Sequence, residues 1–274
     1  MFEVELLDTL QNRIHAALSA ARAPLVVGIC GAQGSGKTTL AVALAAMLEA
    51  EGVAVATLSL DDLYLTRAER QKLAREVHPL FATRGVPGTH DMALGLETLD
   101  ALKCGKAVPL PRFDKGNDDR AATETWRSAP EETQVLLLEG WCLGALPQDP
   151  VALADPVNAL EAGEDPEHLW RSHANKALAG PYQALFAQID LLVLLAAPGW
   201  DVVAKWREQQ EAELRTTGAA RAMSPAEVQR FIQHYERLTR WILEEMPARA
   251  DLVVQLSEER KVLALSPPSP DQAP

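Results

Sequence analysis

Residues 31–38 read Gly-Ala-Gln-Gly-Ser-Gly-Lys-Thr and fit the pattern G-x-x-x-x-G-K-[ST] at every position. In a loop of this pattern the backbone N–H groups surround phosphate oxygens, the lysine reaches the terminal phosphates, and the final hydroxyl binds Mg²⁺. A lysine at the beginning of a helix opposes the helix dipole, so Lys37 needs an anionic partner. The pattern therefore predicts a phosphate-binding loop rather than a turn that only joins two elements.

The elements expected on either side of this loop are those that position a phosphate. Residues 25–30 are short and apolar and predict a buried strand, whereas residues 38–49 are rich in Ala and Leu and predict a helix. The loop then lies at a helix N-terminus, where free N–H groups attract anions. We expect the following residues to bind the nucleotide: Gly31, Ala32, Gln33, Gly34, Ser35, Gly36, Lys37, Thr38 and Thr39.

Carboxylates follow two further strands that the sequence predicts. Residues 53–60 form an apolar strand before Asp61 and Asp62, and residues 134–140 form another, with Glu139 near its end. Ligands of open α/β sheets bind at the carboxyl ends of the strands. An acid that ends a buried strand beside a phosphate loop is typical of a Mg²⁺ site, so Thr38 and Glu139 are the expected metal-binding residues. Helix capping explains one of the two aspartates, but not readily both.

A loop and a helix hold further polar residues. Residues 84–91, Arg-Gly-Val-Pro-Gly-Thr-His-Asp, form a shaped loop that suits a small substrate, although a surface turn in which Asp91 caps the next helix explains them equally well. The helix expected over residues 200–217 places Arg207 and Arg215 in i,i+4 pairs with one glutamate. This helix is either an exposed salt-bridged face or a lid whose arginines close on phosphate.

The alternation of strands and helices predicts the fold class. We expect an α/β three-layer sandwich with a mostly parallel central sheet, helices on both faces, and a helical lid over residues 200–222. One domain over residues 1–265 should begin with an amphipathic helix over residues 3–21. The Pro-rich residues 266–274 are expected to be disordered.

Local signals also place breaks and ends in the second half of the chain. Asp165 followed by proline is typical of a helix start. Gly180 and Pro181 are typical of a break within the helical stretch that follows. Residues 251–256 are apolar and predict the last strand.

Composition excludes several classes of function. The chain has 274 residues, of which 47% are hydrophobic and 23% charged, enough for one large core. Its net charge of −12 argues against a nucleic-acid partner. Three scattered cysteines without metal-ligand spacing fit a reducing compartment. Since no stretch predicts a signal peptide or a membrane span, we expect a cytoplasmic protein. The oligomeric state is left open.

Together the motifs resemble those of the plant-type D-glycerate 3-kinase family. This family belongs to the P-loop small-molecule kinases, with uridine kinase, pantothenate kinase and phosphoribulokinase. The matching blocks stand in family order, and RGVPGTHD and EGWCLG are more specific than the phosphate loop. The blocks are GAQGSGKTT (31–39), SLDDLYLT (59–66), RGVPGTHD (84–91), PRFDKGNDDR (111–120), LLEGWCLG (137–144), Val157-Asn158 and WREQQEAELR (206–215).

The resemblance implies roles for residues in these blocks. Asp61 stands where the wider group has its catalytic aspartate, and Glu139 matches the acid of the group's E-G motif. Arg207 and Arg215 fall in the lid region, and we expect Asp61, Lys37 and Arg207 to act in catalysis. The blocks expected to face the acceptor contain the predicted substrate-binding residues Asp62, Tyr64, Arg84, His90, Asp91, Lys115 and Arg120.

The activity implied by the resemblance is phosphorylation of D-glycerate to 3-phosphoglycerate with ATP and Mg²⁺. Asp61 would accept the hydroxyl proton, and Arg84, Lys115 and Arg120 are candidates for binding the carboxylate. The nearest alternative is a kinase for a nucleoside, pantothenate or a sugar phosphate. A nucleotide-hydrolysing regulatory module is a second. The guanine signature N-K-x-D does not occur, which favours ATP over GTP.

Overall fold

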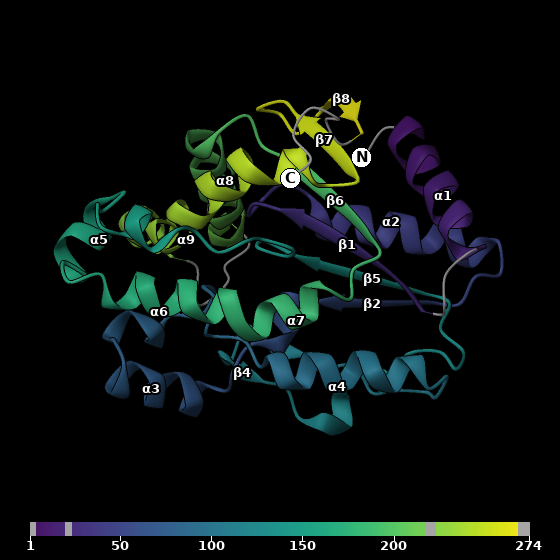
Figure 1. Ribbon diagram of the computed structural model, residues 1–274, viewed down its shortest axis with the longest axis horizontal. Helices are drawn as coiled ribbons and strands as arrows, with labels where there is room; N and C mark the ends of the chain where they lie inside the picture. Colours follow the sequence, from purple (N-terminus) through teal and green to yellow (C-terminus); the bar gives the residue numbers. More distant parts are fainter. Residues whose placement is uncertain (1–3, 20–23, 217–222, 268–274) are drawn as a thin grey trace.

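A six-stranded sheet forms the centre of the computed structural model, which describes residues 4–19, 24–216 and 223–267 (Figure 1). The strand order is β2-β5-β1-β6-β7-β8, and within the described residues only the last pair is antiparallel. A separate hairpin consists of β3 and β4. The strands are β1 Leu25–Gly31, β2 Val55–Ser59, β3 Phe113–Asp114, β4 Asp119–Arg120, β5 Val135–Gly140, β6 Leu191–Ala196, β7 Leu252–Leu256 and β8 Val262–Ser266.

The central strands are apolar on both faces. Every residue of β1 is buried, and β5 and β6 are each buried except for one residue near the carboxyl end. Strands of this kind need helices on both sides to exclude water. Ile29 of β1 and Ser59 of β2 both pair with Glu139 of β5, so the three strands end at the same edge of the sheet.

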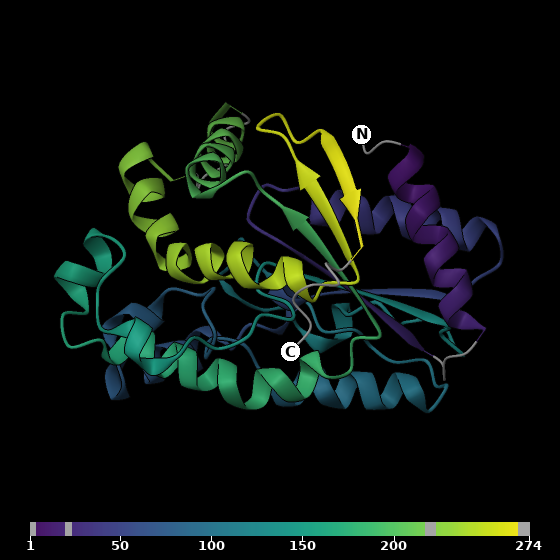
Figure 2. The ribbon, with the colours of Figure 1, turned by 45° about the horizontal axis from the view of Figure 1, so that its top comes forward.

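Helices cover both faces of the sheet. α1 and α2 lie together on one side, and α4, α6 and α7 run along the other (Figure 1; Figure 2). α8 lies beyond the carboxyl ends of the strands, and α9 runs from there back along the sheet toward the start of β7 (Figure 1; Figure 2). The predicted three-layer α/β fold is therefore confirmed. The helices are α1 Val4–Leu18, α2 Lys37–Ala50, α3 Arg67–Glu76, α4 Met92–Lys103, α5 Ala159–Glu164, α6 Leu169–Ala177, α7 Gln183–Phe186, α8 Trp200–Thr216 and α9 Pro225–Glu245.

The two ends of the described chain refine the predicted boundaries. α1 is shorter than expected and buries Leu6, Leu10 and Ile14. β7 is not the last strand, because β8 follows it and pairs with it antiparallel; the apolar residues 262–265 are a signal that could have shown this strand. β8 includes Ser266, and the predicted tail beyond residue 267 lies outside the described residues. The described part of the chain contains no helix that is long and apolar enough to cross a membrane.

The helix expected to start at Asp165 begins instead at Leu169. The Asp165 carboxylate accepts the N–H groups of Trp170 at 2.9 Å and Arg171 at 3.2 Å, five and six residues further on. The expected start was therefore wrong by one helical turn. The break predicted within the helical stretch is confirmed, since Gly180 has a non-helical backbone between α6 and α7.

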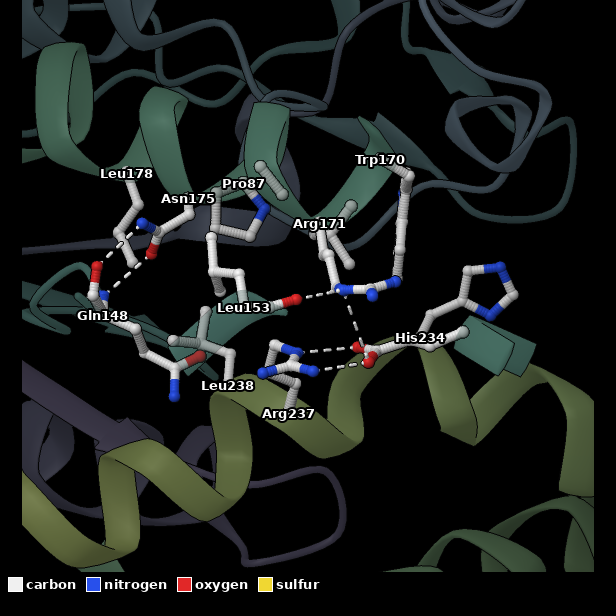
Figure 3. A pocket seen from close by; sticks show the side chains of 13 residues that line it. Pro87, Gln148, Leu153, Trp170, Arg171, Asn175, Leu178, His234, Arg237 and Leu238 are labelled. Atoms are coloured by element: carbon white, nitrogen blue, oxygen red, sulfur yellow. Dashed lines mark hydrogen bonds and ion pairs between the residues drawn. The ribbon is translucent and has the colours of Figure 1, made fainter. Parts of the chain in front are cut away.

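A buried ion network joins α5 and α6 to α9. Glu161 of α5 is fully buried and accepts hydrogen bonds from Arg237 of α9 at 2.9 and 2.7 Å. Arg171 of α6 lies 4.0 Å from Glu161 and donates to Asp165 at 2.9 Å. Figure 3 shows the side chains of Arg171 and Arg237 entering the same cavity from α6 and α9. The cavity has a volume of about 40 Å³, room for water rather than for a substrate, so the network is structural.

Removal of the Glu161 charge should destabilise the protein, because Arg237 would stay buried without its counter-ion. We expect Glu161→Gln to lower the free energy of unfolding by about 3–5 kcal/mol, measured by urea denaturation.

Glu164→Gln is the matched control, since Glu164 lies on the same helix and pairs with Arg230 of α9. These two side chains are 46% and 51% exposed, and an exposed pair contributes about 0–1 kcal/mol. Equal losses in the two variants would contradict a structural role for the buried network.

Candidate active site

The loop between β1 and α2 has the geometry of a phosphate cradle. Gly34 and Gly36 adopt left-handed backbone conformations with φ of 78° and 93°, which favour glycine. Among the described residues no side chain caps the N-terminus of α2, so the N–H groups of its first turn are open to an anion. The fully buried Ser35 hydroxyl has no hydrogen-bond partner there either. Both features fit a loop whose free N–H and hydroxyl groups donate hydrogen bonds to a bound phosphate.

Lys37, Thr38 and Glu139 meet at the beginning of α2. Lys37 Nζ donates to the Ala32 carbonyl at 3.1 Å, which bends the ammonium over the loop. Thr38 Oγ1 donates to Glu139 Oε1 at 3.0 Å. A hydroxyl and a carboxylate oxygen suit Mg²⁺, which normally fills its other positions with phosphate oxygens and water. The described residues form no cluster of three or more His, Cys, Asp or Glu that could hold a metal alone.

Asp61 is held by two hydrogen-bond donors. The Tyr64 hydroxyl lies 2.8 Å from Oδ1 and the Lys115 ammonium 2.7 Å from Oδ2. Burial by itself would raise the pKa of this carboxyl, but the Lys115 charge and the two hydrogen bonds lower the pKa to about 2. Asp61 is therefore ionised at neutral pH.

Asp62 has different surroundings. Its carboxylate accepts a hydrogen bond from the Phe113 N–H at 3.0 Å, which holds the β3–β4 hairpin to the turn after β2. Burial raises the pKa of Asp62. Ser59 Oγ accepts the Asp61 N–H at 3.3 Å and caps the short 3-10 turn after β2, so neither aspartate is needed as the cap. Asp61 and Asp62 line two adjoining cavities, which share Thr38 and Glu139 in their walls.

One cavity of about 270 Å³ joins the phosphate loop to Asp61. Most of its wall consists of predicted site residues, namely Gln33, Gly34, Gly36, Lys37, Thr38, Thr39, Asp61, Tyr64, Arg84, Lys115, Glu139 and Arg207. Four further residues complete the wall and were missed as site residues: Trp141, Gln210, Phe231 and Tyr235. Phe231 and Tyr235 fall on the apolar stripe of a helix, and that pattern gives no sign of a site.

Several predicted site residues lie behind the cavity wall. His90 is 5% exposed, stacks on Tyr64 at 4.5 Å between ring centroids, and places Nδ1 2.6 Å from the Tyr182 hydroxyl. Burial lowers the pKa of His90 to about 3, so the ring is neutral. Asp91 caps α4 and accepts a hydrogen bond from Arg120 at 2.9 Å. Direct ligand contact stays a prediction for these residues and for Asp62, Gly31, Ala32 and Ser35.

Contacts from α9 and from the end of β5 shape the loop over residues 84–91. Gly85 has a φ of 137°, and a Cβ there would lie 2.0 Å from the Tyr235 hydroxyl, so only glycine fits. That hydroxyl donates to the Arg84 carbonyl at 3.0 Å, and the Trp141 indole donates to the Gly85 carbonyl at 2.8 Å. The loop is thereby held in a fixed shape, with Arg84 at the cavity.

Of the two arginines expected in the lid, Arg207 reaches the cavity. Its guanidinium pairs with Glu211 and lies 5.4 Å from the centroid of the Phe231 ring. Its Nε is buried and lacks a partner among the described residues. Arg215 donates instead to the Met223 carbonyl at 2.5 Å. Arg207 is therefore the better placed of the two to meet a phosphate.

Sequence comparison relates the chain to known kinases. Residues 26–152 match the Phosphoribulokinase / Uridine kinase family. The uncharacterized kinase mug58 of Schizosaccharomyces pombe is 38% identical over 222 residues, which are 77% of this chain and 78% of that protein. The chloroplastic D-glycerate 3-kinase of Arabidopsis thaliana is 36% identical over 258 residues, 86% of this chain but 53% of the plant protein, so this chain spans about half of it.

Structure comparison agrees with these matches. The solved D-glycerate 3-kinase from Cryptococcus neoformans has a TM-score of 0.80 and 26% identity, with 96% of this chain and 99% of that chain covered. The parallel sheet and the loop of residues 31–38 define a P-loop kinase. The chain belongs to the phosphoribulokinase / uridine kinase family, as the motifs predicted.

The different surroundings of the two aspartates predict different effects of substitution. Asp61→Asn keeps the shape but removes the proton acceptor at the cavity, so kcat should fall by about 10²–10⁴-fold with little change in nucleotide binding. Asp62→Asn should lower kcat less, because Asp62 fastens the hairpin from outside this cavity.

The two variants are compared at saturating nucleotide, Mg²⁺ and acceptor, with nucleotide affinity measured by calorimetry. A larger loss of kcat in Asp62→Asn would reverse the roles assigned here.

Proposed function

We propose that this protein transfers the γ-phosphoryl group of ATP to the primary hydroxyl of D-glycerate, giving ADP and 3-phosphoglycerate. The names of the plant and fungal relatives support this acceptor. One observation about the site supports it independently. The cavity beside Asp61 is lined by four cationic side chains, which suit an acceptor that carries a negative charge: Lys37, Arg84, Lys115 and Arg207.

The four cations divide into two groups by their position. Lys37 belongs to the phosphate loop and Arg207 to α8, and these two suit the transferring phosphoryl group. Arg84 and Lys115 come from the loop of residues 84–91 and from the β3–β4 turn. They are the candidates for the carboxylate of glycerate, and Arg can bind a carboxylate through two parallel hydrogen bonds.

Arg120 is a weaker candidate than the sequence indicated. Its guanidinium donates to the Asp91 carboxylate at 2.9 Å and to the Tyr64 carbonyl at 3.3 Å. Arg84 likewise pairs with Asp118, but Arg84 lines the cavity beside Asp61, whereas Arg120 lies outside its wall. We therefore assign Arg120 to positioning Tyr64 and leave the carboxylate to Arg84 and Lys115.

Asp61 is the proposed proton acceptor. The O–H bond of the acceptor breaks, its proton passes to the Asp61 carboxylate, and the alcohol oxygen bonds to the γ-phosphorus as the bond from that phosphorus to ADP breaks. Lys37 and Arg207 neutralise charge on the phosphoryl oxygens. Thr38 and Glu139 would hold Mg²⁺, which supplies further neutralisation of that charge when bound.

A nucleoside is the second acceptor that a specific observation favours. Trp141, Phe231 and Tyr235 line the same cavity as Asp61, and aromatic side chains can stack on a base. Arg84 pairs with Asp118 and Lys115 with Asp61 when no acceptor is bound, and a neutral nucleoside offers neither cation an anion in place of these carboxylates. The charge of the wall therefore favours a small hydroxy acid.

An acceptor screen with ATP and Mg²⁺ tests the assignment. We expect kcat/KM to be highest for D-glycerate, lower for L-glycerate and glycolate, and lowest for nucleosides and pantothenate, with slow ATP hydrolysis when no acceptor is added. ADP release measured by a coupled assay gives all these values with one preparation.

A higher kcat/KM for a nucleoside or pantothenate than for D-glycerate would refute the acceptor. ATP turnover at the same rate without any acceptor would instead favour a nucleotide-hydrolysing module.

A further inference from the structure

The ion pair between Lys115 and Asp61 blocks the group that the reaction needs. Lys115 Nζ lies 2.7 Å from Asp61 Oδ2, and both side chains line the cavity. Tyr64 donates to the other oxygen, Oδ1. Each carboxylate oxygen of Asp61 therefore already accepts a hydrogen bond, and one of the two donors is a full positive charge.

The ammonium of Lys115 is free to move, although the backbone beneath it is fixed. Asp114 Oδ1 accepts the N–H groups of Gly116 at 2.8 Å and Asn117 at 3.1 Å, which closes the β3–β4 turn. Arg70 donates to the Asp118 carbonyl at 2.7 Å and anchors the end of the turn. The Lys115 side chain itself is 62% exposed, and Asp61 is its one hydrogen-bond partner in the part of the chain that the structure describes.

Solvent weakens this ion pair, since the side chain of Lys115 is 62% exposed and that of Asp61 is 30% exposed. Folding alone therefore does not explain why a lysine is held against the proton acceptor. The pair does affect chemistry, because burial would raise the pKa of Asp61, whereas the Lys115 charge and the hydrogen bonds from Lys115 and Tyr64 together keep it low. A carboxylate of low pKa is a weak proton acceptor.

We propose that Lys115 senses the acceptor: its ammonium pairs with Asp61 in the acceptor-free site and transfers to the carboxylate of the bound hydroxy acid, which frees Asp61 Oδ2 for the hydroxyl proton. The inference rests on the proposed function, since it needs an acceptor with a carboxylate. It deepens that function by linking recognition of the carboxylate to activation of the base. Water and neutral alcohols carry no negative charge, so Lys115 remains paired with Asp61. Hydrolysis of ATP without the acceptor is therefore slow.

Replacement of Lys115 by methionine separates this mechanism from simple binding. In Lys115→Met the acceptor carboxylate loses one charged partner, so D-glycerate binding measured by calorimetry should weaken by about 10–100-fold, and kcat/KM for D-glycerate should fall at least as much. Asp61 is released at the same time, so ATP hydrolysis without acceptor and phosphorylation of glycerol should both rise above wild type. Lys115→Arg should keep D-glycerate preferred and hydrolysis low.

Lys72→Met is the matched control, because Lys72 of α3 forms an ion pair with Glu76 and its side chain is 66% exposed, close to the value for Lys115. It should match wild type in every assay. The proposal is overturned if Lys115→Met leaves acceptor-free hydrolysis and glycerol phosphorylation unchanged or lowered, since a residue that only binds or only stabilises would behave so. If wild type does not use D-glycerate, the proposed function fails, and the hydrolysis rate of Lys115→Met still decides whether Lys115 restrains Asp61.

Discussion

The parallel pairing of β2, β5 and β1 is the constraint on which the site depends. Ser59 and Ile29 both pair with Glu139, so the three strands reach the same edge in register. That edge then holds the loop of residues 31–38 after β1, Asp61 after β2 and Glu139 of β5. A shift of one residue would turn Glu139 to the other face of the sheet, away from Thr38.

The acceptor side of the site depends on contacts between distant elements. α9 presses Tyr235 against Gly85, and the buried Glu161–Arg237 pair holds α9 to α5. Arg207 reaches the cavity from α8 and lies over Phe231 of α9. The phosphate side is therefore built on strands, whereas the acceptor side is built by helices packed on a loop. The acceptor side is the part in which related kinases can differ in substrate while they keep the same phosphate chemistry.

Local sequence patterns predicted the phosphate side of the site well. The loop of residues 31–38, the strand before it and the helix after it are each specified by neighbouring residues. The structure places Thr38 next to Glu139, and Mg²⁺ binding by these two residues stays a prediction. The family motifs also predicted Arg84, Lys115 and Arg207 as site residues, and all three line the cavity.

Contacts between segments far apart in the chain could not be predicted from the sequence. Tyr235 reads as one more apolar residue on an amphipathic helix, and only the fold brings its hydroxyl to residue 85. His90 and Arg120 have the right chemistry for a ligand, but the fold directs them to Tyr182 and Asp91. β8 was missed although its first four residues are apolar. The turn before it brings Arg260 within 2.6 Å of the Gly34 carbonyl, so the phosphate loop has a support that no local pattern signals.

The central claim is that Asp61 and the phosphate loop act on the primary hydroxyl of a small hydroxy acid. The most direct measurement is the ³¹P NMR spectrum of the product formed from D-glycerate, ATP and Mg²⁺, recorded with proton coupling. Phosphorus on the primary oxygen couples to the two protons of one CH₂ group and gives a triplet, which is the result predicted here. A doublet, from phosphorus beside a single C–H proton, or a spectrum with no phosphate ester besides the nucleotides, would contradict the account.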